Sequence, residues 1–142
     1  MTPVPSQSAE DYLERILELV QETGQARVVD IANSLNVRQA SVTNMVKKLC
    51  ELGYVDHEKY KRGLVLTKKG QQVALEIQRR HETLSSFFSM LELDDETQRR
   101  DIEGIEHHLS RGTVRVLEDL VSFFEEHPEV LKKFLGSRSS VR

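Results

Sequence analysis

Residues 28–49 read VVDIANSLNVRQASVTNMVKKL, and this stretch decides the fold of the first half of the chain. Apolar residues recur at the helical spacing of three and four over residues 28–35 and again over residues 39–52. Asn36 and Val37 separate the two runs and predict a tight turn, and Gly53 predicts the end of the second helix. Two helices joined by a short turn are typical of a helix-turn-helix.

The sequence on either side extends this motif to a winged helix-turn-helix. Upstream, residues 8–11 (SAED) have the spacing of a capping box, which predicts a helix that runs to residues 23–24. Downstream, residues 54–57 and 63–67 contain β-forming residues and flank a charged tip at residues 58–62, which predicts a β-hairpin. We therefore expect an N-terminal winged helix-turn-helix domain over residues 1–71.

The second helix of this motif has a polar face that is suited to DNA. In a winged helix-turn-helix the recognition helix enters the major groove, and its N-terminal residues reach the base edges. The candidate base-reading residues are Arg38, Gln39, Ser41, Thr43 and Asn44. The candidate phosphate contacts are Lys47, Lys48 and, at the wing tip, Lys59, Lys61 and Arg62. Residues 38–70 hold eight basic and three acidic residues, which favours a phosphate-facing surface over a merely solvated helix face.

The second half of the chain predicts an α-helical domain over residues 72–142, so the expected fold class is mostly α. A long helix is expected over residues 68–91, where apolar residues and His81 recur at the helical spacing and form an inward stripe. Further helices are expected from residue 94 or 95 to residue 110, over residues 114–126 and over residues 129–135. A disordered tail is expected from residue 136 onward.

Composition limits the class of protein. A chain of 142 residues with 38% hydrophobic and 30% charged residues fits a soluble protein with one core and a second small one. No apolar run is long enough to span a membrane, and the N-terminus has no signal-peptide features. The single cysteine, Cys50, excludes an intrachain disulfide and fits the reducing cytoplasm. We expect a cytoplasmic protein that has no membrane partner.

Metal-ligand residues gather at helical spacing in the predicted helix before residue 110. Glu103, Glu106 and His107 project within an arc of roughly 100° if this helix is regular. The apolar stripe of the same helix is separate, and it consists of Ile102, Ile105 and Leu109. Two carboxylates and an imidazole that converge on one point suit a divalent transition metal.

Each candidate ligand also has a simpler explanation. Asp11 and Glu14 could be solvent-facing acids opposite the apolar stripe of the first helix, and Glu103 and Glu106 could be surface acids. His81 could be a hydrogen-bonded core histidine, because a lone histidine on an apolar face more often has that role. The other histidines, His57, His108 and His127, have no comparable neighbours and are expected to be structural. Spacing alone does not bring the candidate ligands together in one site.

Five segments stand out when the motifs are taken together: AEDYLE (residues 9–14), ASVTNMVKKL (40–49), YKRGLVLT (60–67), RHE (80–82) and DIEGIEHH (101–108). They resemble the diphtheria-toxin-repressor family, most closely its manganese transport regulator branch. The resemblance covers nearly the whole chain. It implies a homodimeric repressor that binds double-stranded operator DNA when divalent metal binds between a winged-helix domain and a helical dimerisation domain.

The resemblance also implies a ligand set and a metal. The matching ligands are Asp11, Glu14, His81, Glu103, Glu106 and His107, which hold about two metal ions close together. The iron-responsive members have methionine at the position of Asp11 and cysteine at that of Glu103, and they carry a further C-terminal domain that this sequence does not show. Hard carboxylate in place of soft sulfur favours Mn²⁺, with Fe²⁺ as a second effector.

Two other classes of function remain open at the level of the sequence. A winged-helix regulator with an organic effector, or with none, would bind DNA without metal. A small di-metal enzyme would activate water between two ions. The sequence shows no Gly-rich phosphate cradle and no catalytic loop, and a saturated ligand set leaves no coordination position for a substrate, so we expect no enzyme.

Overall fold

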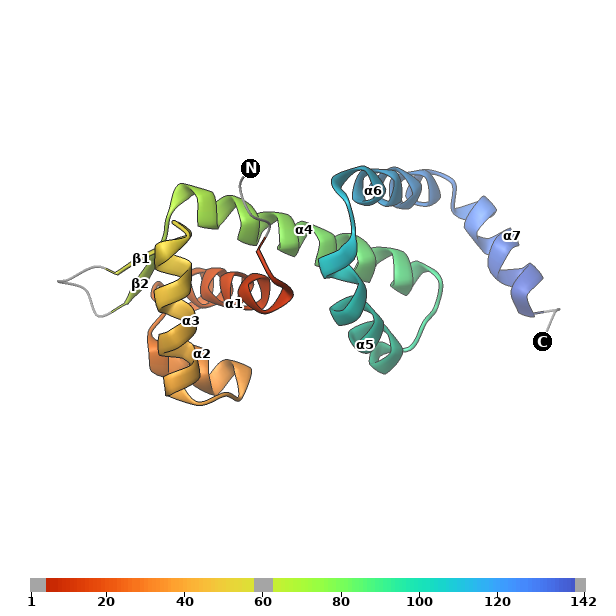
Figure 1. Ribbon diagram of the computed structural model, residues 1–142. Coiled ribbons are helices and arrows are strands. Elements are labelled where there is room, and N and C mark those ends of the chain that lie inside the picture. The colour runs from red at the N-terminus through yellow and green to blue at the C-terminus, as the bar shows by residue number, and fades with distance from the viewer. Residues whose placement is uncertain (1–4, 58–62, 140–142) are drawn as a thin grey trace. The chain divides into compact units, whose positions relative to one another are not determined.

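The computed structural model describes residues 5–57 and 63–139, and helices dominate these residues, as predicted (Figure 1). The elements are, in chain order, α1 (Gln7–Thr23), α2 (Val28–Leu35), α3 (Gln39–Glu51), β1 (Val55–His57), β2 (Leu64–Leu66), α4 (Lys68–Met90), α5 (Asp95–Ile105), the 3₁₀ helix η1 (Glu106–His108), α6 (Arg111–Glu126) and α7 (Pro128–Ser139). They form two compact units, residues 1–78 and residues 79–142, and the division falls within α4. Among the described residues, no helix combines the length and the apolar character needed to cross a membrane.

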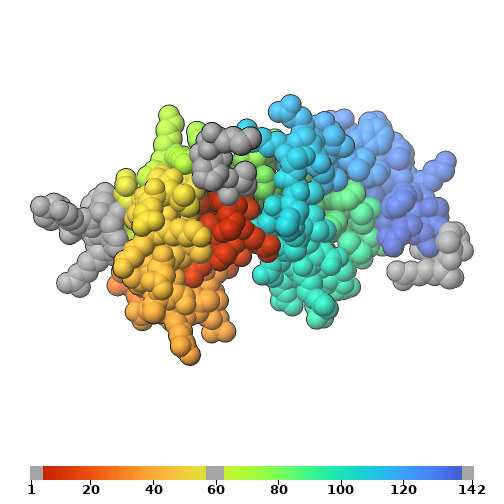
Figure 2. Space-filling view, in the orientation of Figure 1, coloured from red at the N-terminus to blue at the C-terminus, as the bar shows by residue number. Residues whose placement is uncertain are grey.

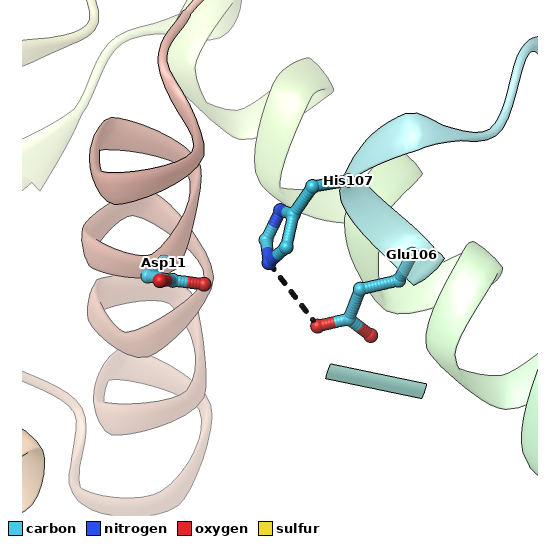
Figure 3. A group of neighbouring side chains, drawn as sticks. All are labelled: Asp11, Glu106 and His107. Atoms are coloured by element: carbon cyan, nitrogen blue, oxygen red, sulfur yellow. Dashed lines mark ion pairs between the residues drawn. The ribbon is translucent and has the colours of Figure 1, made fainter. Parts of the chain in front are cut away.

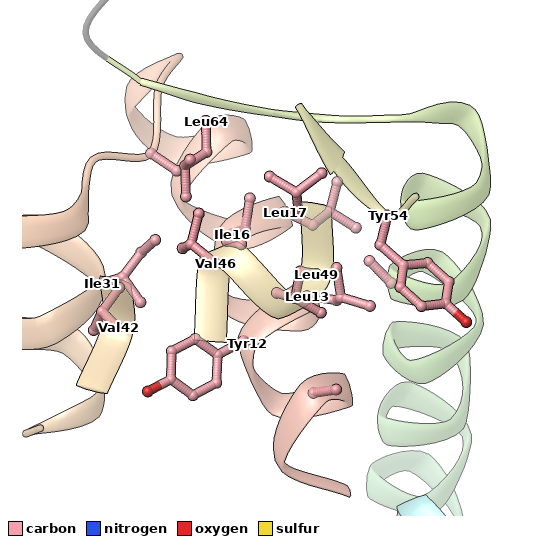
Figure 4. Close-up of a cluster of buried hydrophobic side chains, with 14 of the residues drawn as sticks. Tyr12, Leu13, Ile16, Leu17, Ile31, Val42, Val46, Leu49, Tyr54 and Leu64 are labelled. Carbon is pink, nitrogen blue, oxygen red and sulfur yellow. The ribbon is translucent and has the colours of Figure 1, made fainter. Parts of the chain in front are cut away.

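The first unit is built around one hydrophobic core. The core residues come mainly from α1, α2, α3 and the hairpin, with Ala74 from α4. They include Tyr12, Leu13, Ile16, Leu17, Ile31, Val42, Val46, Leu49, Tyr54 and Leu64 (Figure 4). Apart from Tyr12, which was not predicted, the helical members named here occupy positions of the predicted three-and-four spacing. The periodicity therefore identified the buried face of each of these helices correctly.

The turn between α2 and α3 lies where the sequence predicts it. Asn36 adopts a left-handed conformation with φ of 55°, and its backbone N–H donates to the carbonyl groups of Ala32 and Asn33. Asparagine is one of the few residues besides glycine that tolerate this conformation. After α3, Gly53 has φ of 82°, a value that strongly favours glycine, so this residue ends the recognition helix as expected.

The start of α1 differs from the prediction by two residues. The N-cap is Ser6, whose hydroxyl accepts a hydrogen bond from the backbone N–H of Ala9 at 3.1 Å. Ser8, the first residue of the predicted capping box, lies inside the helix. Two serines at an interval of two residues offer alternative caps, and the sequence pattern favoured the wrong one.

This correction gives a prediction about stability. Ser6→Ala should destabilise the first unit by about 1 kcal/mol, because it leaves a helix-terminal N–H without its side-chain acceptor. Ser8→Ala is the matched control and should have no destabilising effect, since alanine favours a helix interior. Urea unfolding followed by tyrosine fluorescence measures the first unit alone, because all three tyrosines, Tyr12, Tyr54 and Tyr60, belong to it. Equal destabilisation by both variants would contradict the assignment of the cap.

The predicted hairpin is present as an antiparallel pair. Val55 pairs with Leu66, and His57 pairs with Leu64. A bridge between Ala26 and Leu64 joins the hairpin to the segment between α1 and α2. The tip of the hairpin, where Lys59, Lys61 and Arg62 were predicted to contact phosphate, lies outside the described residues.

The second unit has a smaller core. Among its described residues, the buried apolar side chains are Leu84, Ile102 and Val114. Other large apolar side chains on its helices are exposed, namely Ile105, Val116, Phe123, Val130 and Phe134, with Val116 at 65%. A unit that leaves this much apolar surface in water is suited to burial against another chain.

Three predictions about the second unit are wrong. The α-helix expected up to residue 110 ends at Ile105 and continues as the 3₁₀ turn η1. The His81 side chain is 51% exposed, so this residue does not belong to the inward stripe that was predicted for α4. The expected disordered tail is helical up to Ser139, and the Arg138 guanidinium donates to the carbonyl oxygen of Leu91 at 3.3 Å. This contact ties α7 to the end of α4.

Candidate metal centre and DNA-binding surface

The carboxylate of Glu106 is the centre of a polar cluster in the second unit. The residue is only 3% exposed, and η1 carries it. Its Oε2 lies 2.9 Å from Nδ1 of His81 on α4. Its Oε1 lies 3.5 Å from Nε2 of His107, the next residue along the chain (Figure 3). One buried carboxylate thus has an imidazole nitrogen beside each of its oxygens.

The chemistry of this cluster fits a divalent metal ion. A buried carboxylate is costly unless hydrogen bonds or a cation compensate its charge. Imidazole nitrogens and carboxylate oxygens are the donors that divalent first-row transition metals bind. Each oxygen of the Glu106 carboxylate has one imidazole nitrogen beside it, His81 Nδ1 at Oε2 and His107 Nε2 at Oε1. Glu106 with His81 and Glu106 with His107 are therefore two pairs of donors, each of which could contribute to a metal site.

The geometry differs from the arc that the sequence predicts. Glu103 lies on α5 and is exposed, whereas Glu106 and His107 lie on η1, where the chain has left the α-helical path. Within the described part of the chain, no group of ligand atoms within 4.8 Å of one another includes Glu103. The ligand role of Glu103 stays a prediction.

The remaining predicted ligands lie in the first unit. Asp11 and Glu14 are partly exposed residues of α1, one helical turn apart, so they project from the same side of that helix. Figure 3 shows Asp11 on this helix. Their neighbours Leu13 and Ile16 enter the core, so the two carboxylates lie outside it. Their roles as ligands also stay predictions.

Of the other histidines, His127 has a structural role. Its ring stacks on Phe123 with 4.5 Å between the centroids, and its Nδ1 lies 3.0 Å from the carbonyl oxygen of Phe123, near the end of α6. His108 is exposed on η1. His57 ends β1, and its side chain lies outside the description.

Arg80 is a residue that the sequence analysis did not single out for a role. It precedes His81 on α4, and its Nη1 donates to the backbone oxygen of Glu106 at 3.3 Å. Its partner is a backbone atom 26 residues away, so no side-chain pattern in the sequence could have indicated this contact. The next arginine toward the N-terminus, Arg79, forms a bidentate pair with Glu118 on α6 at 2.6 and 2.7 Å. Hydrogen bonds from Arg79 lower the pKa of the Glu118 carboxyl below its usual value.

The exposed face of α3 carries the predicted DNA contacts. Val42, Val46 and Leu49 are buried, and the polar residues before and between them are exposed: Arg38, Gln39, Ser41, Thr43, Asn44, Lys47 and Lys48. The helix forms part of the surface of the first unit (gold in Figure 2). The Thr43 hydroxyl donates to the carbonyl oxygen of Gln39 at 3.0 Å.

One of the basic residues counted toward the phosphate-facing surface has an internal role. The Lys69 ammonium donates to the carbonyl oxygen of Leu52 at 3.0 Å and lies 4.5 Å from the ring centroid of Tyr54. It therefore joins the start of α4 to the end of α3. Lys69 should therefore not be counted among the basic residues that are available to contact phosphate.

Comparisons with known proteins identify both halves of the chain. Residues 6–64 match the N-terminal DNA-binding domain of the iron dependent repressors, and residues 67–135 match their metal-binding and dimerisation domain. The HTH-type transcriptional regulator MntR of Lysinibacillus sphaericus is 45% identical over 136 residues, which are 96% of this chain and 97% of that protein. The regulator of the same name from Listeria monocytogenes is 47% identical over 129 residues, or 91% of this chain and 90% of that protein.

Solved structures agree with this result. The manganese regulator SloR superposes with a TM-score of 0.71 at 30% identity, over 85% of this chain and 55% of that one. The IdeR protein of T. acidophilum gives a TM-score of 0.71 at 28% identity, over 84% of this chain and 56% of that one. The chain thus spans little more than half the length of these solved chains. It belongs to the iron dependent repressor family, in which a DNA-binding domain precedes a metal-binding and dimerisation domain.

Proposed function

We propose that this chain is a Mn²⁺-responsive repressor that acts in the cytoplasm, binds operator DNA as a homodimer and controls genes for manganese uptake. The observation that carries the proposal is the buried carboxylate of Glu106 with imidazole nitrogens beside both of its oxygens. Relatives named as transcriptional regulators, and similar structures described as manganese-dependent, support the choice of metal. The metal is an effector in this proposal, and the protein is not an enzyme.

Carboxylates dominate the proposed ligand set. It consists of Asp11, Glu14, His81, Glu103, Glu106 and His107, and it would hold about two ions per chain. Four carboxylates and two imidazoles form an oxygen-rich shell, which favours Mn²⁺ over metals that prefer sulfur, and Fe²⁺ is the second candidate. Raw affinity increases toward later first-row metals, so selectivity for Mn²⁺ must come from the geometry of the ligands.

Charge explains how the ligands could control DNA binding. A bound divalent cation supplies positive charge beside carboxylates that otherwise repel one another at short range. In this proposal Asp11 and Glu14 then join the ligands of the second unit, which links the DNA-binding domain to the dimer. This link restricts the two recognition helices to a separation of about 34 Å, one turn of DNA, or a multiple of it. By thermodynamic linkage, operator DNA must strengthen metal binding by the factor by which metal strengthens DNA binding.

A titration with Mn²⁺ tests the proposal. Metal-stripped protein is titrated while the EPR signal of free Mn²⁺ is recorded, and binding of about two ions per chain is expected. The same preparation is then used to select duplexes from a random DNA library with Mn²⁺, with Fe²⁺ under anaerobic conditions, and without metal. Absence of binding at micromolar free Mn²⁺ would overturn the proposal, as would selection of the same duplexes without metal.

Glu103→Ala is expected to abolish Mn²⁺-dependent DNA binding while leaving a folded dimer, because Glu103 is exposed and contributes nothing to the core. Asp101→Ala is the matched control, since it removes the same charge from another exposed position of α5. Stoichiometry by EPR, dimerisation by sedimentation and DNA binding by fluorescence anisotropy are measured for both variants. A normal Mn²⁺ response in Glu103→Ala would remove this residue from the ligand set without affecting the roles of Glu106, His81 and His107.

A further inference from the structure

The turn that carries Glu106 begins where α5 ends. The chain passes from the α-helix into η1 at Glu106 and becomes extended at Leu109, with φ of −85° and ψ of 132°. The last carbonyl groups of a helix have no intrahelical partner and need another donor. For the carbonyl of Glu106 this donor is Nη1 of Arg80 at 3.3 Å. A side chain of α4 therefore supplies a hydrogen-bond donor to the turn.

Two neighbouring residues of α4 contact the same residue of η1 in different ways. His81 Nδ1 contacts the carboxylate of Glu106, and Arg80 contacts its backbone oxygen (Figure 3 shows the Glu106 and His107 side chains). The first contact joins His81 Nδ1 and Glu106 Oε2, two atoms that would coordinate a bound metal ion. The second contact uses no ligand atom, so it can persist whether or not metal is bound.

We propose that Arg80 is a positioning residue that holds η1 against α4 and so keeps Glu106 and His107 beside His81 before metal arrives. This inference rests on the proposed function, because it concerns the same ligands. When His81 and Glu106 bind a metal ion, the contact between them is lost. The hydrogen bond from Arg80 to the Glu106 carbonyl oxygen then still holds η1 against α4. The cation then binds ligands that are already arranged, which avoids the cost of ordering them.

Arg80 also has an effect that opposes metal binding. Its guanidinium is positive and near the ligands, so it repels a divalent cation. If repulsion dominated, removal of the charge would strengthen metal binding. If positioning dominates, as we infer, removal weakens it. The sign of the change therefore distinguishes the two roles.

The experiment compares Arg80→Met, Arg80→Lys and Arg79→Met in the full-length chain. Arg80→Met is expected to weaken Mn²⁺ binding by about 10- to 100-fold, the range measured when residues that orient metal ligands are removed. Arg80→Lys should recover part of this loss, since an ammonium can still donate to the carbonyl oxygen. Arg79→Met is the matched control. It removes a charge one residue away and breaks the contact with Glu118, and it should leave Mn²⁺ affinity unchanged.

Hydrogen exchange in the metal-free protein gives a second readout that does not depend on metal. Arg80→Met should increase exchange at the backbone amides of residues 106–109 by about tenfold, because it removes the donor to the Glu106 carbonyl oxygen. Arg79→Met should not, because the Arg79 guanidinium pairs with Glu118 on α6. Unchanged exchange there, or tighter Mn²⁺ binding by Arg80→Met, would overturn the role of Arg80. Failure of the unmodified protein to bind Mn²⁺ would overturn the proposed function instead, while the exchange result would still decide whether Arg80 holds the turn.

Discussion

Glu106→Gln is expected to have the largest effect on function of any single substitution in the metal cluster, weakening Mn²⁺ binding at least about 100-fold, or roughly 2.7 kcal/mol. Glutamine has the size of glutamate, so the buried space stays filled. It lacks the negative charge, however, and one carboxylate oxygen becomes an amide nitrogen that donates hydrogen bonds and does not bind metal. Because both imidazoles lie beside this one carboxylate, its loss affects the whole cluster.

The control for this variant is Glu125→Gln, which removes the same charge from an exposed position of α6. Mn²⁺ binding by EPR, together with Mn²⁺-dependent DNA binding, is compared between the two. Far-UV circular dichroism establishes that the metal-free proteins are equally folded. Wild-type Mn²⁺ affinity in Glu106→Gln would mean that the buried carboxylate is a structural acceptor and that the metal is held elsewhere.

Gly70→Ala is expected to have the largest effect on stability, about 3 kcal/mol, at the upper end of the usual cost of overpacking. Gly70 lies in the first turn of α4, and a Cβ there would overlap the carbonyl oxygen of Tyr54 and lie 2.9 Å from its carbonyl carbon. The obstacle is backbone, and it cannot rotate away. The Tyr54 N–H donates to Leu49, and its carbonyl oxygen accepts from Thr67, so both sides of this residue are fixed.

Gly136→Ala is the comparison, because it also replaces a helical glycine but would meet no atom within 4 Å. It should raise stability slightly, by about 0.5–1 kcal/mol at most, since alanine is the better helix former. Urea unfolding by tyrosine fluorescence reports on Gly70→Ala, and far-UV circular dichroism reports on Gly136→Ala. A Gly70→Ala variant as stable as the wild type would show that α4 can move away from Tyr54 at little cost.

Dimer formation accounts for the unusual surface of the second unit. Its buried apolar residues are few, while Phe123, Val130 and Phe134 on α6 and α7 are exposed. The family match assigns dimerisation to this half of the chain. Exposure of these apolar side chains to water is unfavourable in a monomer, and it is removed when a second copy of the chain covers them.

The sequence by itself determined the elements whose structure depends on residues close together along the chain. The spacing of Leu13, Ile16 and Leu17 identified the buried face of α1, and the left-handed turn at Asn36 and the stop at Gly53 followed from residue types that tolerate positive φ. These features arise from contacts three to five residues apart, which a sequence pattern displays directly. The helix-turn-helix was predictable for this reason.

The tertiary structure decided what lies around Glu106. A regular helix would have placed Glu103, Glu106 and His107 on one face, but the helix ends at Ile105 and the 3₁₀ turn redirects the chain. Helical spacing predicts a shared face only while the helix continues, because a 3₁₀ turn has a different angle per residue. The contacts of Glu106 with His81 and Arg80 join residues 25 and 26 positions apart, and the helical end of the chain contacts Leu91 from 47 positions away. Such contacts depend on how whole helices pack, so no local pattern could have revealed them.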